Sequence, residues 1–353
     1  MLNYKMILYF AKIDKAAVGT FSTDLIRDAA IKIITQHGHG QNQSSPQSPL
    51  FLYIPFQAVH APLQAKKGWK NKVNRSAFPK GKAGDNRFVY AAMVLEMDAA
   101  VGAIANALKS ARMYNNSVIL VSSDNGGEPK NGGYNWPYRG HKAGLWEGGV
   151  KAVGFLHSPL LFGAAGRAYT GLLHVSDWLP TFVNLAGGDA SVIQGLDGVD
   201  VWPAIISGGD ASPRTELLHN IDMYGGSGPG GFGNAAIRVG ELKLLSMGYR
   251  ATVSSWYVPP GCPPSVCVAP PPPPAGTCLA EANNTAQLWL FNLTADPYER
   301  CNLAGQTRYA SAVSSIMEKL AQYNDTAVPV RYPKDDPAAK PKNPAGSWGP
   351  WRH

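Results

Sequence analysis

The stretch Val118-Ile-Leu-Val-Ser-Ser-Asp-Asn-Gly-Gly127 decides the fold class of this chain. Its first four residues are apolar, which is typical of a buried strand. In open α/β sheets, ligands bind beyond the carboxyl ends of the strands. Asp124 and Asn125 stand at that end, and their oxygens suit a hard cation such as Ca²⁺ or Mg²⁺. Gly126 and Gly127 allow the backbone to turn tightly beneath a ligand. An Asx-turn that merely ends the strand is the alternative interpretation.

Helices and strands alternate on both sides of this stretch. The sequence predicts helices at 24–35 and 87–112, buried strands at 50–55, 118–121 and 149–156, and a helix at 175–185 that Pro180 bends or interrupts. Further along it predicts a hairpin from 236–238 and 242–245, a strand at 288–293 and a helix at 308–323. The alternation indicates a largely parallel α/β domain, residues 1–230, followed by a small antiparallel α+β subdomain, residues 231–353.

Two more side chains are candidates for chemistry. His60 follows the predicted strand 50–55 in Gln57-Ala-Val-His-Ala-Pro-Leu-Gln64, although a lone histidine is more often a structural residue. Lys142 lies between glycines and aromatic residues in the segment 136–149. It is either an anion clamp or a surface lysine whose stem covers a tryptophan.

The charge balance favours anionic partners. The 353 residues carry a net charge of +8, which by itself does not separate nucleic acid, sulfated glycan and a membrane surface. No run reaches the 18 apolar residues typical of a membrane span. A loop after His60 concentrates the basic residues Lys66, Lys67, Lys70, Lys72, Arg75, Lys80, Lys82 and Arg87 against one acid, Asp85. This loop is predicted either to attract polyanions, with Trp69 stacking on a sugar ring, or to be an ordinary solvated loop.

The cysteines and sequons indicate a secretory compartment. Four cysteines lie near a polyproline stretch, which fits disulfides better than a zinc site because the spacings are irregular and no histidine is close. Six Asn-x-Ser/Thr sequons begin at Asn42, Asn74, Asn115, Asn283, Asn292 and Asn324. The N-terminus shows no signal peptide, since its apolar patch at 6–11 is too short. An incomplete N-terminus would reconcile these observations.

Several collinear segments resemble the arylsulfatase B branch of the type I sulfatases. They include Phe51-Leu-Tyr-Ile-Pro-Phe-Gln-Ala-Val-His60, Ser123-Asp-Asn-Gly-Gly127 and Asn135-Trp-Pro-Tyr-Arg-Gly-His-Lys-Ala-Gly-Leu-Trp-Glu-Gly-Gly149. The likeness continues through His174-Val-Ser-Asp-Trp178 and closes at Gly346-Ser-Trp-Gly-Pro-Trp351. The resemblance implies an alkaline-phosphatase-like mixed sheet flanked by helices, here without its first strands. It implies lysosomal or secreted localisation.

The resemblance also implies roles for the candidate residues. Asp124 and Asn125 would be ligands of one Ca²⁺, while His60 and Lys142 would contact the sulfate and leaving-group oxygens. The partner would be a sulfated carbohydrate or an aryl sulfate ester, not nucleic acid. A non-catalytic sulfated-glycan-binding protein and a phosphatase or phosphodiesterase of the same superfamily are the alternatives.

The family's nucleophile is a cysteine (or a serine) in Cys-x-Pro-x-Arg, oxidised to formylglycine, upstream of the position of His60. Residues 1–59 contain no cysteine and no Asp-Asp pair to complete the metal site. Cys262-Pro-Pro-Ser-Val266 is a near match, but it lies after Lys142 and has valine in the arginine position. We therefore expect the chain as given to be an inactive fragment with an incomplete Ca²⁺ ligand set.

Overall fold

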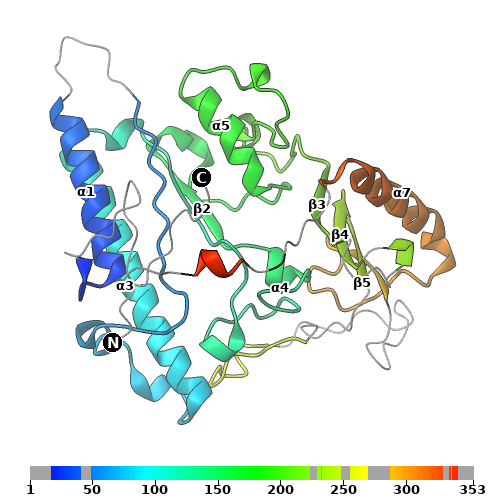
Figure 1. The fold of residues 1–353 in the computed structure, drawn as a ribbon, viewed down its shortest axis with the longest axis horizontal. Coiled ribbons are helices and arrows are strands. Elements are labelled where there is room, and N and C mark those ends of the chain that lie inside the picture. The colour runs from blue at the N-terminus through cyan, green and yellow to red at the C-terminus, as the bar shows by residue number, and fades with distance from the viewer. Residues whose placement is uncertain are drawn as a thin grey trace. The chain divides into compact units, whose positions relative to one another are not determined.

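The computed structural model describes residues 17–40, 49–222, 229–231, 233–247, 255–268, 287–328, 334 and 336–340 (Figure 1). The chain divides into two compact units. The first comprises residues 1–73, 89–114 and 329–353, and the second comprises residues 74–88 and 115–328. The predicted boundary after residue 230 stays a prediction. Cys278, the polyproline stretch 270–274 and the segment 346–351 lie outside the described residues.

The first unit is built on two long helices, α1 (Ser22–Gly40) and α3 (Lys82–Ser110), of which α3 begins in the second unit. Both predicted helices are confirmed, each with somewhat different ends. Ala30 and Ile34 of α1 are buried against Ile104 of α3. The predicted apolar face of α3 is also confirmed, because its members are buried or half-buried: Met93, Met97, Val101, Ile104 and Leu108.

The prediction of a buried strand at 50–55 is wrong for the described residues. The segment is extended but pairs with no other described strand, so it forms no ladder. Its side chains alternate. Leu50, Leu52, Ile54 and Phe56 pack on the α1–α3 core, whereas Phe51 and Tyr53 are 74% and 78% exposed. A continuous apolar run reads as strand whether or not a partner strand is present, which explains the error.

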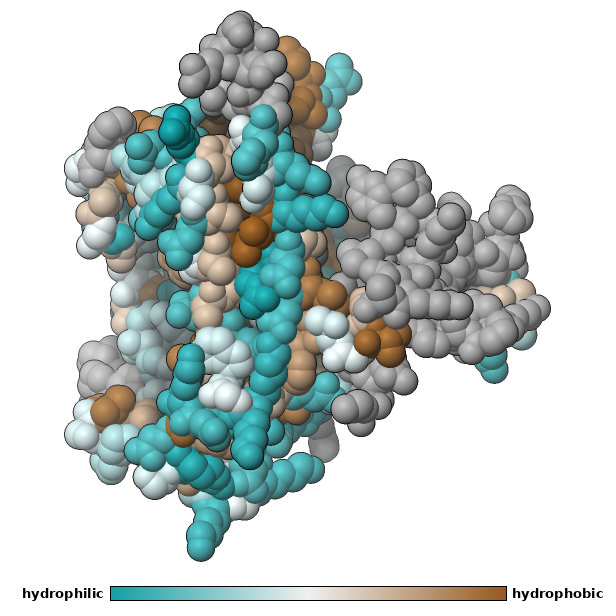
Figure 2. Space-filling model, turned by 90° about the vertical axis from the view of Figure 1, so that its left-hand side faces the viewer, coloured by the Kyte–Doolittle hydropathy of each residue, from teal (hydrophilic) through white to brown (hydrophobic). Residues whose placement is uncertain are grey.

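By length and composition, α3 is the one helix among the described residues that is able to cross a membrane. This is weak evidence, because core helices pass the same test. The apolar residues of α3 pack in two clusters of the first unit, around Ile104 and around Met93. Figure 2 shows hydrophilic side chains, in teal, running along the side of the molecule where α1 and α3 lie.

The second unit opens with a short strand pair. β1 (Ile119–Ser122) and β2 (Gly154–His157) are antiparallel, with Ile119 opposite His157. The predicted parallel arrangement is therefore not seen among the described strands, all of which pair antiparallel. Residues 147–150 form a helical turn, α4 (Glu147–Val150), instead of the start of the predicted strand 149–156. Glycine is required at 148 and 149, because an added Cβ atom would lie 2.4 Å from the Gly140 carbonyl oxygen or 2.2 Å from that of Gly144.

Three further short helices are α2 (Lys67–Lys70) in the first unit, and α5 (Trp178–Leu185) and α6 (Trp202–Ile206) in the second. The prediction that Pro180 disturbs its helix is wrong. Pro180 falls in the first turn of α5, where no backbone donor is needed, and a 3-10 turn (Val175–Asp177) precedes it.

A four-stranded antiparallel sheet forms the main core of the second unit. Its order is β3 (Glu216–Ile221), β4 (Asn234–Val239), β5 (Leu242–Met247) and β6 (Leu288–Asn292). The predicted hairpin is confirmed, with Gly240 at positive φ in the turn. Helix α7 (Ala310–Thr326) packs on one face through Ile316 and Leu320, as its predicted amphipathic pattern requires. β3 lies before residue 230 yet belongs to this sheet.

Candidate functional site

The turn that follows β1 carries Asp124 and Asn125. Ser123 begins it with a reciprocal pair of hydrogen bonds to Val153. The Ser123 backbone N donates to the Val153 carbonyl at 2.9 Å, and the Val153 N donates to Ser123 Oγ at 3.0 Å. These bonds extend the β1–β2 pairing by one residue and fix where the turn leaves the strand. Asp124 is exposed and Asn125 is half-buried, both directly beyond the carboxyl end of β1.

Gly126 and Gly127 are required by close backbone contacts. A Cβ atom at Gly126 would lie 1.8 Å from the Gly148 carbonyl oxygen, and one at Gly127 would lie 2.7 Å from the Gly133 carbonyl carbon. The Gly126 N donates to the Gly149 carbonyl at 2.9 Å. Neither glycine has a positive φ, so both are required here for close backbone packing rather than for a left-handed turn, and the segment packs directly on the one that contains Lys142.

Lys142 lies in a closed loop, residues 139–149, which we call the Lys142 loop. The Gly148 N donates to the Arg139 carbonyl at 2.7 Å and so ties the two ends of the loop together. The Lys142 N donates to the Gly127 carbonyl at 3.2 Å. The structure therefore brings the Asp124–Asn125 turn and the Lys142 loop into contact through their backbones.

His141, next to Lys142, is a half-buried residue that the sequence interpretation did not single out. Its Nδ1 lies 2.7 Å from the Lys142 carbonyl oxygen and 4.0 Å from Glu128 Oε1. Its ring makes an edge contact with Tyr257, with ring centroids 5.1 Å apart. The only sequence signal was its place in the Gly-His-Lys segment, beside a residue already chosen.

A buried ionic cluster lies at the base of the Lys142 loop. Lys243 of β5 is fully buried, and its Nζ lies 2.8 Å from Glu147 Oε1 and 2.8 Å from Glu299 Oε1. The Glu147 backbone N donates to Glu299 Oε2 at 2.6 Å. Two carboxylates thus share one ammonium in a buried site, and the loop is attached to the four-stranded sheet through them.

The pKa values of the cluster follow from this arrangement. Burial raises the pKa of Glu299 to about 7, against the opposing effect of Lys243. Burial acts in the same direction on Glu147, but the charge of Lys243 outweighs it and the pKa of Glu147 is lowered. For Lys243, burial is outweighed by Glu299 and Glu147, so its pKa is raised. Burial lowers the pKa of nearby His219 to about 3, with Lys243 acting in the same direction.

Arg139, at the other end of the loop, is buried in an aromatic box. Its guanidinium carbon lies 3.8 Å from the ring centroid of Trp146 and 4.7 Å from those of Trp256 and Trp289. Its NH1 donates to the Glu299 carbonyl at 3.0 Å. Desolvated cation–π contacts of this kind are among the stronger ones, so Arg139 fixes its end of the loop firmly.

His60 belongs to the other compact unit. It is exposed, and its Nδ1 lies 2.7 Å from the Ala61 carbonyl oxygen. It follows the extended segment 49–56 rather than a strand. The predicted approach of His60 to Asp124 and Lys142 therefore stays a prediction.

The metal-binding capacity of the site is limited. No group of three or more His, Cys, Asp or Glu side chains within the described part of the chain is arranged to hold a metal ion. Asp124 and Asn125 provide the oxygen chemistry that Ca²⁺ prefers, but Ca²⁺ takes about six to eight oxygen ligands. These two side chains by themselves do not form a complete site.

Comparison with known proteins decides the family. The sequence profile named Sulfatase matches residues 4–188. The chain belongs to the sulfatase family. It is 42% identical to mouse arylsulfatase J over 346 residues, which cover 94% of this chain and 54% of that protein. It is 26% identical to dog N-acetylgalactosamine-6-sulfatase over 295 residues, covering 82% and 51%.

Solved structures show the same sulfatase fold. The crystal structure of Ps i-CgsB in complex with k-i-k-neocarrahexaose has a TM-score of 0.62 and 26% identity, and covers 86% of this chain and 55% of that one. The predicted fold class, an alkaline-phosphatase-like α/β sulfatase fold, is confirmed. This sulfatase chain spans about half the length of the curated relatives it matches. Members of the family generally bind a metal ion.

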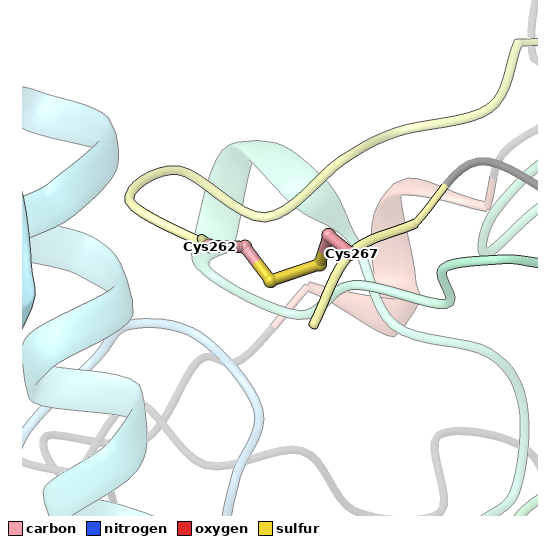
Figure 3. Close-up of a disulfide and its surroundings, with 2 residues drawn as sticks. All are labelled: Cys262 and Cys267. Atoms are coloured by element: carbon pink, nitrogen blue, oxygen red, sulfur yellow. A yellow bond between two sulfur atoms is a disulfide. The ribbon is translucent and has the colours of Figure 1, made fainter. Parts of the chain in front are cut away.

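The near match to the family's nucleophile motif is not a nucleophile. Cys262 forms a disulfide with Cys267, with an S–S distance of 2.06 Å (Figure 3). Cys301 is buried and is also disulfide-bonded. No cysteine among the described residues is free. A thiol locked in a disulfide is unable to attack or to be oxidised to an aldehyde, and the predicted disulfides are confirmed for these residues.

The predicted polyanion-binding residues differ in how freely their charges face solvent. Lys66 bonds Asp24 and lies 2.8 Å from Glu96, and Arg75 pairs with Asp85. Lys72 lies 3.9 Å from the centroid of Trp69, so its ammonium covers the ring that was expected to stack on a sugar. Lys67 is exposed and Lys70 half-buried on α2. Of the five, Lys67, Lys70 and Lys72 are thus the residues best placed to attract a polyanion, and this role stays a prediction.

Proposed function

We propose that this chain forms part of a sulfuric ester hydrolase of the arylsulfatase B type, which acts on sulfate esters of glycans. The observation that carries the proposal is the 42% identity to mouse arylsulfatase J across 94% of the chain. The contact between the Asp124–Asn125 turn and the Lys142 loop supports it, because the two candidate segments lie together at one strand end. Such placement suits binding of one small anion.

The candidate residues have distinct roles in this proposal. Asp124 and Asn125 would supply two of the oxygen ligands of a Ca²⁺ ion, and such an ion would stabilise negative charge on the sulfate. Lys142 binds a sulfate oxygen as charge develops there. His60 donates a proton or hydrogen bond to the leaving oxygen as the S–O bond breaks.

Names of related proteins support a sulfated carbohydrate as the substrate class. They include an N-acetylgalactosamine-6-sulfatase and a protein solved with a neocarrahexaose. The net charge of +8 favours such a polyanion. Disulfides and exposed sequons, among them Asn74 and Asn115, support a lysosomal or secreted location.

Residues 1–353 expressed by themselves are expected to bind a sulfate ester without turning it over. The sequence contains no Cys-x-Pro-x-Arg motif. Sequencing the DNA 5′ of the Met1 codon distinguishes the hydrolase hypothesis from the binding-protein hypothesis. An in-frame Cys-x-Pro-x-Arg there supports hydrolysis, and a stop codon directly upstream contradicts it.

The binding part of the proposal is tested by calorimetric titration of residues 1–353 with 4-nitrocatechol sulfate in the presence of Ca²⁺. The Lys142→Ala variant is expected to bind about tenfold more weakly, because a charge-assisted hydrogen bond is lost. Lys130→Ala is the matched control, since Lys130 is exposed and lies in the same unit.

Unchanged affinity in Lys142→Ala would contradict the proposal. Tighter binding or turnover of 4-nitrophenyl phosphate would favour the phosphatase alternative. Turnover of the sulfate ester that disappears in Asp124→Ala would show that a different nucleophile exists within residues 1–353.

A further inference from the structure

Glu299 contacts both ends of the Lys142 loop. Its Oε2 accepts a hydrogen bond from the Glu147 backbone N at 2.6 Å, and its carbonyl accepts one from Arg139 NH1 at 3.0 Å. Its Oε1 lies 2.8 Å from Lys243 Nζ. One residue, distant in sequence, therefore joins the two ends of the loop to β5 of the four-stranded sheet.

The contacts of Glu299 require a specific backbone conformation. Its φ is +56°, in the left-handed region that non-glycine residues rarely adopt. Such a conformation is unfavourable for a residue with a side chain and persists where surrounding contacts determine it. Next to it, the Trp256 Nε1 donates to the Tyr298 carbonyl at 3.0 Å, which connects the Glu299 segment to the aromatic box of Arg139.

The loop itself has little freedom between these ends. Gly140 is at positive φ, and a Cβ there would lie 2.6 Å from the Cβ of Trp146. The Gly140 N donates to the Ser255 carbonyl, and the Gly144 N donates to the His141 carbonyl. Its ends and its interior are both bonded, so displacement of one end shifts the backbone that carries Lys142.

We propose that Glu299 is a positioning residue that holds the Lys142 loop in the geometry used to bind the sulfate group. The inference rests on the proposed function and extends that same site. Glu299 acts through Arg139 and Glu147 and does not touch the anion. Lys243 neutralises the buried charge that this arrangement requires.

Asp177 provides a matched control. It is also fully buried, it pairs with Arg214, and it accepts hydrogen bonds from the backbone N of His174 at 2.7 Å and of Val199 at 3.0 Å. It therefore joins separate segments as Glu299 does, in the same unit, but the hydrogen-bond partners of its carboxylate (His174, Val199 and Arg214) lie outside the Lys142 loop. Asp177→Asn and Glu299→Gln are both isosteric changes that remove one buried carboxylate.

The test combines amide hydrogen exchange with calorimetric titration of residues 1–353 by 4-nitrocatechol sulfate. In Glu299→Gln, the amides of residues 140–149 are expected to exchange at least about tenfold faster, because local opening becomes easier. The sulfate ester is expected to bind on the order of tenfold more weakly, since the lysine is misplaced. Asp177→Asn is expected to leave both measurements of the loop unchanged. Glu299→Asp, which keeps the charge but shortens the side chain, should show a smaller change and serves if Glu299→Gln does not fold.

Unchanged exchange of residues 140–149 in both Glu299 variants would overturn the positioning role. Faster exchange with unchanged affinity would overturn the assignment of Lys142 to the sulfate while confirming that Glu299 holds the loop. Failure of the wild-type chain to bind the ester would contradict the proposed function, and the exchange data would still decide whether Glu299 anchors the loop. The experiment therefore distinguishes failure of the proposed function from failure of the positioning role of Glu299.

Discussion

The two sheets of the second unit differ sharply in burial. In β1–β2 no residue is fully buried, and Phe155 of β2 is 55% exposed. In β4, β5 and β6 the central residues are buried on both faces, including Trp289, Leu290 and Phe291. The candidate site follows the less buried sheet, whereas the charges that fix its loop come from the more buried one.

This difference shows that the two sheets have separate roles in forming the candidate site. A short exposed strand pair defines where Asp124 and Asn125 leave the sheet, but it has few contacts to hold a loop in place. The four-stranded sheet has the packing density to bury a lysine, and Lys243 reaches α4 from it. Residues that are distant in sequence from the Lys142 loop thus hold it in place.

The largest expected effect comes from removing the central cation of the buried cluster. Lys243→Met leaves Glu147 and Glu299 buried together without a counter-charge, and should lower the free energy of unfolding by about 3–5 kcal/mol. Urea unfolding monitored by circular dichroism measures it. Lys319→Met is the control, because Lys319 pairs with Glu216 at a partly exposed site and such pairs contribute about 1 kcal/mol or less. Equal effects of the two changes would show that the cluster is not special.

A smaller effect is expected from pH, because Glu299 of the cluster and nearby His219 change stability in opposite directions as pH varies. The folded pKa of Glu299, about 7, exceeds its ordinary 4.5, so its contribution to stability is complete below pH 4.5 and is lost as pH rises through 7. The folded pKa of His219, about 3, lies below 6.5, so its contribution is complete above pH 6.5 and is lost as pH falls towards 3.

Between pH 4.5 and 6.5 these two slopes oppose each other, each up to about 1.4 kcal/mol per pH unit. Glu299→Gln should therefore make the stability of the protein rise with pH, and His219→Gln should make it fall. The charged and titratable groups that act on this pair are Lys243, Glu147, His174 and Arg238, and the variants leave them in place. Unfolding free energies measured at several pH values give the slopes, and identical slopes in the two variants would contradict the assignment.

The smallest effect is expected in the exposed strand pair. Phe155→Ser should change the free energy of unfolding by about 0.5 kcal/mol or less, because the ring is already largely in water. Leu290→Ala, at a fully buried position of β6, should cost about 2–5 kcal/mol and completes the contrast. Denaturant midpoints at constant m-value measure both changes. A large loss from Phe155→Ser would mean that β2 is covered in solution.

Local sequence patterns predicted the long helices and the strands β4, β5 and β6 of the four-stranded sheet, but not β3. The apolar spacing of α3 and α7 follows the helical period, and a two-residue turn with Gly240 fixes the β4–β5 hairpin. The segment 49–56 was predicted less well, because an apolar run does not reveal whether a partner strand exists. The antiparallel pairing of β1 and β2 depends on contacts that alternation alone does not encode.

The candidate site was predicted in part. Asp124, Asn125 and Lys142 share local signals, namely a strand end and a glycine-rich segment, and the structure places their segments in contact. The anchoring residues carried no such signal. Glu299 is 152 residues from Glu147, and only the folded chain brings them within 2.6 Å. Long-range ionic contacts of this kind have no periodicity for a sequence pattern to reveal.

The aromatic box around Arg139 has an optical consequence. Trp146 and Trp289 are fully buried, with ring centroids 5.2 Å apart, and the guanidinium lies over both. Their emission should be shifted to shorter wavelengths than that of exposed tryptophans and sensitive to the nearby charge. Arg139 is the first residue of the Lys142 loop. The fluorescence of this tryptophan pair therefore reports, without a label, whether the loop keeps its contacts with the four-stranded sheet.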